Sequence, residues 1–218
     1  MLEARLGGVR AVLFDMDGVL VNNSEWHSAA WVLCAQELLG LAIRPDDSRI
    51  HGGLNHEILA ALLGRPLAAA DVREFHEVKE ERYRTLARGK LKPVRGLATY
   101  LEHLEAISMP VALVTSADRT NVAFVLGELG LEFHFPMRIT GADVARGKPD
   151  PEAYREGARL VGVPPRDCLV HEDSLNGVRS AVSAGSRVAA LTTTTTSESL
   201  LEAGASWILA DFEEWMAG

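Results

Sequence analysis

The chain has 218 residues, of which 47% are hydrophobic and 24% charged, so it can build one large domain, or a domain with an insertion, around a substantial core. Its net charge of −8 argues against a nucleic-acid-binding surface, but a local site on an acidic protein can still bind a small anion. We expect neither a signal peptide nor a membrane span. Cys34 and Cys168 lie in apolar stretches, which predicts buried free thiols and a cytoplasmic protein.

The first predicted element is a buried strand that ends in two acidic residues. Ala11–Phe14 are all apolar, as in a strand covered on both faces of a parallel sheet. Asp15 and Asp17 follow, and alternate side chains of an extended segment point to the same side. Gly18 permits a sharp turn directly after them. The two carboxylates repel each other unless a cation or a shared proton lies between them, so the motif indicates a cation site or, alternatively, an acidic turn.

The segment that follows, residues 22–90, is predicted to be helical throughout. Apolar residues recur at helical spacing, and glycine or proline separates one helix from the next. No convincing strand pattern appears there. The predicted helices cover residues 26–40, 46–51, 54–63 and 68–88.

From residue 91 onward, apolar strands alternate with helices. The predicted strands lie at 111–114 and 187–192 and within the segments 135–143, 168–174 and 207–211, and the predicted helices lie at 97–107, 151–161 and 174–185, with a further helix that ends at 129. This alternation of strands and helices predicts an α/β fold with a doubly wound parallel sheet of the Rossmann-like kind. The strand at 11–14 must join that sheet, because alone it has no partner.

The order of elements therefore predicts two domains. Residues 1–21 and 91–218 form an α/β core domain, and residues 22–90 form an all-helical cap domain inserted after the first strand. The threonine run Thr192–Thr196 follows a predicted strand, and we interpret it as a polar surface loop.

Three other strand ends carry reactive side chains. Thr115 and Ser116 could bind anionic oxygens through hydroxyls and amides, or could cap the next helix. Lys148 lies in a glycine- and proline-bounded loop, where a lone lysine is usually solvated. Glu172 and Asp173 form a second acidic pair, which could instead cap the helix that follows.

Taken together, these strand ends meet at one edge of a parallel sheet, where open α/β folds bind their ligands. Two acidic pairs make an oxygen-rich site suited to Mg²⁺. A lysine and hydroxyls supply positive charge and donors for a phosphoryl group. The sequence thus predicts phosphoryl-transfer chemistry on a small-molecule phosphate ester, without a nucleotide-binding loop.

Four ordered segments resemble the motifs of the haloacid-dehalogenase-like hydrolases, and the resemblance covers nearly the whole chain. They are DMDGVLV, VTSAD, GKPDPEAY and HEDSLNGVRSAVSAG. The helical insertion resembles the small cap of the branch that includes β-phosphoglucomutase, phosphoglycolate phosphatase and sugar phosphatases.

The resemblance implies a role for each matching residue. Asp15 is the nucleophile that forms an aspartyl-phosphate, and Asp17 is the acid and base for the leaving group and water. Asp15, the backbone carbonyl of Asp17, and Asp173 hold Mg²⁺, with Glu172 beside it directly or through water. The phosphoryl oxygens are held by the Thr115 hydroxyl, the Ser116 amide and Lys148.

The cap residues point to hydrolysis. His27 stands where the mutases carry a cap histidine, although it could be an exposed helix histidine. His51 begins a stretch that, by resemblance, contacts the substrate, and sugar phosphatases resemble its His-Gly pair. Asn55 lies near the position where mutases have an arginine that grips a second phosphate, which asparagine cannot do.

We therefore expect a Mg²⁺-dependent phosphatase acting on sugar or polyol phosphates. The alternatives are a β-phosphoglucomutase-type mutase and, less expected, a non-catalytic receiver-like phospho-acceptor. We expect no nucleic-acid or membrane partner, and a monomer or weak dimer.

Overall fold

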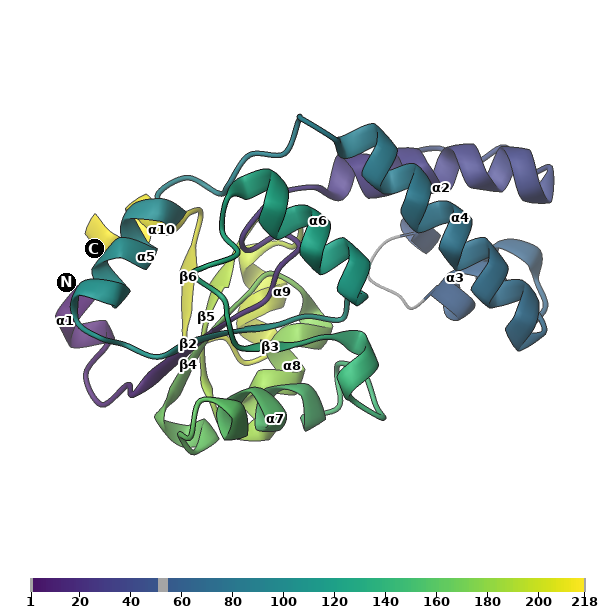
Figure 1. Ribbon diagram of the computed structural model, residues 1–218. Coiled ribbons are helices and arrows are strands. Elements are labelled where there is room, and N and C mark those ends of the chain that lie inside the picture. The colour runs from purple at the N-terminus through teal and green to yellow at the C-terminus, as the bar shows by residue number, and fades with distance from the viewer. Residues whose placement is uncertain (1, 51–54, 218) are drawn as a thin grey trace. The chain divides into compact units, whose positions relative to one another are not determined.

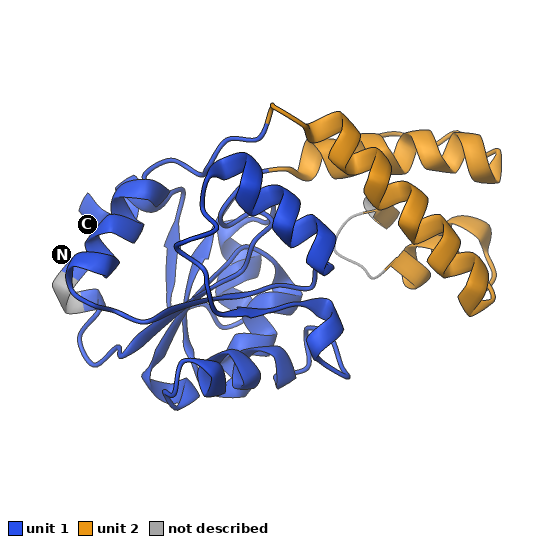
Figure 2. Ribbon diagram, viewed as in Figure 1, with its two compact units in different colours: residues 1–22, 91–218 blue, residues 23–90 orange. Residues whose placement is uncertain are grey.

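The computed structural model describes residues 2–50 and 55–217 (Figure 1). The chain forms two compact units, drawn in separate colours in Figure 2. The first consists of Met1–Asn22 with Leu91–Gly218, and the second of Asn23–Lys90. No helix among the described residues is long and apolar enough to cross a membrane.

The first unit is built on a six-stranded sheet in which every pairing is parallel, in the order β3-β2-β1-β4-β5-β6. The strands are β1 Ala11–Phe14, β2 Val111–Val114, β3 Arg138–Ile139, β4 Cys168–Glu172, β5 Arg187–Leu191 and β6 Trp207–Leu209. The predicted doubly wound α/β class is confirmed. At the centre, Phe14 of β1 pairs with Leu113 of β2 and with His171 of β4, so these strands end at the same edge.

Helices cover both faces of this sheet (Figure 1). They are α1 Leu2–Arg5, α5 Leu97–Ala106, α6 Arg119–Leu129, α7 Glu152–Leu160, α8 Leu175–Ala184, α9 Ser197–Glu202 and α10 Phe212–Ala217, with short 3₁₀ turns η2 Gly141–Asp143 and η3 Pro165–Asp167. The sequence did not predict α1, α9 or α10, which have only four to six residues each. Helices this short show too little periodicity to be recognised.

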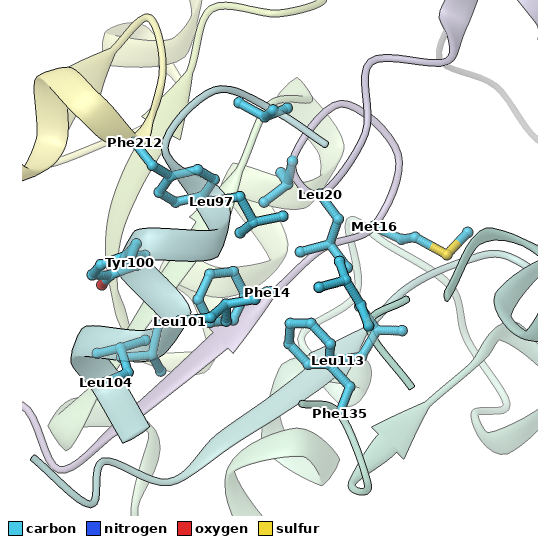
Figure 3. Packing of buried hydrophobic residues seen from close by; sticks show 14 of the residues in the cluster. Phe14, Met16, Leu20, Leu97, Tyr100, Leu101, Leu104, Leu113, Phe135 and Phe212 are labelled. Atoms are coloured by element: carbon cyan, nitrogen blue, oxygen red, sulfur yellow. The ribbon is translucent and has the colours of Figure 1, made fainter. Parts of the chain in front are cut away.

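Strand alternation divides the core of this unit into two layers. Val12 and Phe14 pack on one face with residues from α5, α6 and α10, whereas Ala11 and Leu13 pack on the other with residues from α7, α8 and α9. Figure 3 shows Phe14 among the apolar side chains of the first layer, including Tyr100 and Phe212. Burial on both faces explains why β1 is apolar at every position.

A buried histidine lies in the first layer. His171 has no exposed surface, and its ring centroid lies 5.0 Å from that of Phe14 and 5.1 Å from that of Phe212. The Tyr100 hydroxyl is 3.1 Å from His171 Nε2. Burial lowers the pKa of His171 to about 3, so this imidazole is neutral in the folded protein at physiological pH.

We expect this histidine to make the fold acid-sensitive. Below pH 6.5, His171 becomes protonated in the unfolded chain but stays neutral in the folded protein. The free energy of unfolding therefore falls as the pH falls toward about 3. This one histidine lowers the free energy of unfolding by about 1.4 kcal/mol for each pH unit in that range. Replacing His171→Phe should flatten the pH dependence of the unfolding free energy by that amount in denaturant titrations. His56→Phe, at an exposed position, should not, and equal slopes for all three proteins would contradict the prediction.

The second unit is helical throughout its described residues. It contains α2 Ser24–Leu39, the 3₁₀ turn η1 Ser48–Ile50, α3 Asn55–Leu63 and α4 Ala69–Ala87. Its core includes Trp31 stacked on Phe75, with ring centroids 5.2 Å apart. The predicted helix at 46–51 is wrong in extent, because only a single 3₁₀ turn forms among the described residues there.

Candidate active site

A buried lysine joins two strand ends in the first unit. The loop before α7 carries Lys148, whose Nζ lies 2.6 Å from Asp15 Oδ1 and 2.7 Å from Glu172 Oε1. Nζ also donates to the Val114 carbonyl at 3.0 Å. The Lys148 side chain is only 7% exposed, so the solvated-lysine alternative is wrong. Burial alone would lower the Lys148 pKa, but the Asp15 and Glu172 carboxylates raise it, and the lysine is charged.

Three buried carboxylates converge beside this lysine. Asp15, Glu172 and Asp173 each offer an oxygen, and these oxygens lie within 4.8 Å of one another. Burial raises the Asp15 pKa to about 7 against the lowering effect of Lys148, and burial also raises the pKa of Asp173 well above its usual value. One lysine leaves the cluster short of positive charge, so a divalent cation with a preference for oxygen ligands fits it.

Two glycines make room for these carboxylates. A Cβ on Gly18, whose φ is +80°, would lie 1.9 Å from Asp173 Oδ2. A Cβ on Gly177, in α8, would lie 1.7 Å from Glu172 Oε1. Both distances are shorter than any nonbonded contact, so side chains at these two positions would displace the carboxylates.

Tyr154 belongs to the site and was not predicted from the sequence. Its hydroxyl donates to Glu172 Oε1 at 2.8 Å and accepts from Lys148 Nζ at 3.0 Å. The other Glu172 oxygen, Oε2, accepts from the backbone amides of Asp173 and Ser174. Burial would raise the Glu172 pKa, but Lys148 and these donors lower it, so Glu172 is ionised. Tyr154 lies six residues after Lys148 within GKPDPEAY, where the sequence alone indicates an ordinary core residue of a helix.

The hydroxyl pair after β2 does not cap the next helix. Asp118 takes that position, because its side chain accepts from the Asn121 amide at 2.8 Å. Thr115 is 4% exposed, and its Oγ1 accepts from the Ala117 amide at 3.1 Å. The capping alternative for Thr115 and Ser116 is therefore wrong, and both follow β2 at the edge where β1 and β4 end.

Three other expected site residues, Asp17, His27 and Asn55, are not part of the group of three carboxylates. The half-buried Asp17 contributes no side-chain oxygen to the group of three, although its charge raises the pKa of Asp15. Two belong to the second unit: His27 Nδ1 is 3.2 Å from Lys79 Nζ, and Asn55 Nδ2 is 2.5 Å from His76 Nδ1. His51 lies outside the described residues.

The half-buried His27 is not an exposed helix histidine. Its ring stacks on that of Tyr83 with centroids 3.8 Å apart, so the exposed alternative is wrong. Burial and the Lys79 ammonium lower the His27 pKa to about 3, which makes its imidazole neutral. It is therefore suited to hydrogen bonding within the second unit rather than to carrying charge.

Comparison with known proteins agrees with this geometry. Residues 9–185 match the model of the haloacid dehalogenase-like hydrolase family, and the chain belongs to that family. The chain is 33% identical over 205 residues to validoxylamine A 7′-phosphate phosphatase of Streptomyces hygroscopicus subsp. limoneus, covering 89% of this chain and 91% of that protein.

Two further similarities differ in coverage. The chain is 34% identical over 214 residues to Protein SUPPRESSOR OF QUENCHING 1, chloroplastic, of Arabidopsis thaliana, covering 94% of this chain but only 20% of that protein. The crystal structure of a family IA, variant 3 hydrolase from Entamoeba histolytica superposes with a TM-score of 0.88 at 28% identity. That superposition covers 94% of this chain and 95% of that one. This protein is thus a hydrolase of the haloacid dehalogenase-like class.

Proposed function

We propose that the protein is a Mg²⁺-dependent phosphatase that hydrolyses small phosphate monoesters, sugar or polyol phosphates, through an aspartyl-phosphate on Asp15. The observation that carries this proposal is the ammonium of Lys148 between Asp15 and Glu172, with Asp173 in the same buried group. This arrangement combines a nucleophile, a fixed cation and carboxylate ligands. The similarity to a protein named as a phosphatase supports it.

The mechanism follows from these residues. An Asp15 oxygen attacks phosphorus, and the bond from phosphorus to the ester oxygen breaks while Asp17 protonates the departing alkoxide. Asp17 then takes a proton from water, whose oxygen attacks phosphorus and releases inorganic phosphate from Asp15. Lys148, the Thr115 hydroxyl and the Ser116 amide hold the phosphoryl oxygens throughout.

Asp15, the Asp17 carbonyl and Asp173 would hold Mg²⁺, with Glu172 beside it. When bound, the ion neutralises the like-charge repulsion between carboxylate and phosphate. Because both Glu172 oxygens already accept hydrogen bonds from protein donors, we assign Glu172 mainly to orienting Lys148. Asp173 is then the carboxylate of that pair that binds the ion.

The inserted residues 22–90 serve in this proposal as a cap that selects the leaving group. Asn55 is held by the His76 side chain and lies 3.5 Å from Glu80, and its own neutral amide lacks the positive charge with which an arginine would bind a second phosphate. A neutral leaving group rich in hydroxyls suits these surroundings better than a leaving group that carries a second phosphate.

A panel of phosphate esters tests the proposed function. We expect phosphate release from sugar and polyol phosphates in the presence of Mg²⁺, and loss of release when a chelator removes the ion, because Lys148 alone cannot balance three carboxylates and a phosphate dianion. Colorimetric phosphate release with and without Mg²⁺ is the measurement.

Three outcomes would contradict the proposal. Undiminished release in the presence of chelator would exclude the metal. Isomerisation that depends on a bisphosphate primer would indicate a mutase, and stable self-phosphorylation without turnover would indicate a phospho-acceptor.

A further inference from the structure

The threonine run after β5 contacts the carboxylate cluster. The Thr194 hydroxyl makes a short hydrogen bond to Asp173 Oδ2 and lies 3.1 Å from the Asp173 carbonyl oxygen. The neighbouring Thr193 hydroxyl donates to the Gly18 carbonyl at 2.6 Å. Because β5 pairs with β4, the loop that follows β5 lies at the sheet edge where Asp173 follows β4.

These contacts hold Asp173 between two chain segments. Gly18 lies so close to the Asp173 carboxylate that a Cβ there would overlap it, and Thr193 fixes the carbonyl of that glycine. Thr194 then holds Oδ2 through its hydroxyl. Asp173 is 3% exposed, whereas Thr194 itself is an exposed residue.

The Asp173 carboxylate has a specific need for such a donor. Lys148 hydrogen-bonds to Asp15 and Glu172, and these two carboxylates, whose oxygens lie within 4.8 Å of an Asp173 oxygen, repel that of Asp173. Without a fixed donor, repulsion favours rotation of the Asp173 side chain away from the cluster. A hydrogen bond to Oδ2 opposes that rotation.

We propose that Thr194 is a positioning residue for the metal, because it holds Asp173 in the orientation that binds a divalent ion. This inference rests on the metal site of the proposed function. Partners that orient a metal ligand typically contribute about 10–100-fold to metal affinity. The threonine run is therefore more than a polar surface loop, and Thr193 with Thr194 links the ends of β1, β4 and β5.

Direct Mg²⁺ binding tests this role without any substrate. Isothermal titration of Mg²⁺ into the metal-free 218-residue chain should show about 10–100-fold weaker binding for Thr194→Val, which keeps the shape of the side chain but removes the hydroxyl. Thr194→Ser should restore affinity to near the wild-type value. Thr192→Val, in the same run but without a hydrogen bond from its hydroxyl to Asp173 or Gly18 among the described contacts, should bind like wild type.

The outcomes separate this inference from the proposed function. If the wild type binds Mg²⁺ tightly and Thr194→Val binds it with equal affinity, the positioning role is wrong, but the proposed phosphatase function is unaffected. Failure of Thr194→Ser to recover affinity would also overturn it, because the hydroxyl would then not be the responsible group. A wild-type protein that does not bind Mg²⁺ would overturn both. Circular dichroism of each variant verifies that the fold is retained.

Discussion

Replacing Asp15 with asparagine is expected to abolish phosphate release while leaving the fold intact. Asparagine has nearly the same shape as aspartate, but its neutral amide cannot attack phosphorus. Loss of a nucleophile from a covalent mechanism costs about 10⁴-fold or more in kcat. Steady-state phosphate release from the best substrate of the panel, measured with Mg²⁺ present, checks this expectation.

The control for Asp15→Asn is the same chemical change at an exposed site. Asp71 lies on the surface of α4, and Asp71→Asn should retain wild-type turnover. Circular dichroism and thermal unfolding should show native structure for both variants. Substantial residual turnover by Asp15→Asn would mean that another group is the nucleophile.

Removing the Lys148 ammonium is expected to lower kcat/KM by about 10²–10³-fold, the effect of losing one well-placed donor to a developing charge. Lys148 Nζ forms ion pairs with both Asp15 and Glu172, so Lys148→Ala removes the cation that we propose binds the phosphoryl group. The same change leaves two buried carboxylates without the positive charge that offsets their repulsion. We therefore expect a lower free energy of unfolding as well as a lower kcat/KM. The rates are divided by the concentration of folded protein, so that the two effects can be separated.

Two companion variants sharpen the Lys148 test. Lys148→Met keeps the volume of the side chain without its charge, so it separates loss of charge from formation of a cavity. Lys92→Ala removes an exposed lysine from the same unit and should have no effect. A loss smaller than about tenfold in both Lys148 variants would contradict the placement of this lysine at the phosphoryl group.

Local patterns predicted much of the fold and of the site. The apolar runs located β1 and β2 at their observed bounds, because strands buried on both faces leave a continuous apolar signal. Lys148 and Glu172 were assigned to one crevice because parallel strands end at one edge, and the hydrogen bond between their side chains confirms that they lie together.

Contacts that depend on how strands pair could not be predicted. Thr194 meets Asp173 across 21 positions of sequence, and only the pairing of β4 with β5 brings them together. Tyr154 was missed because its ring packs in the core while only its hydroxyl reaches Glu172. Capping by Asp118 was missed because the hydroxyls of Thr115 and Ser116 gave an equally plausible helix start.

We propose above all that one divalent ion and one phosphoryl group share the site formed by Asp15, Lys148 and Asp173. A crystal structure of the protein soaked with Mg²⁺ and a phosphate mimic such as tungstate tests it most directly. We predict the ion on Asp15 and Asp173, and the mimic within hydrogen-bond reach of Lys148 and Thr115. An ion and mimic bound elsewhere, with these side chains unliganded, would contradict the account.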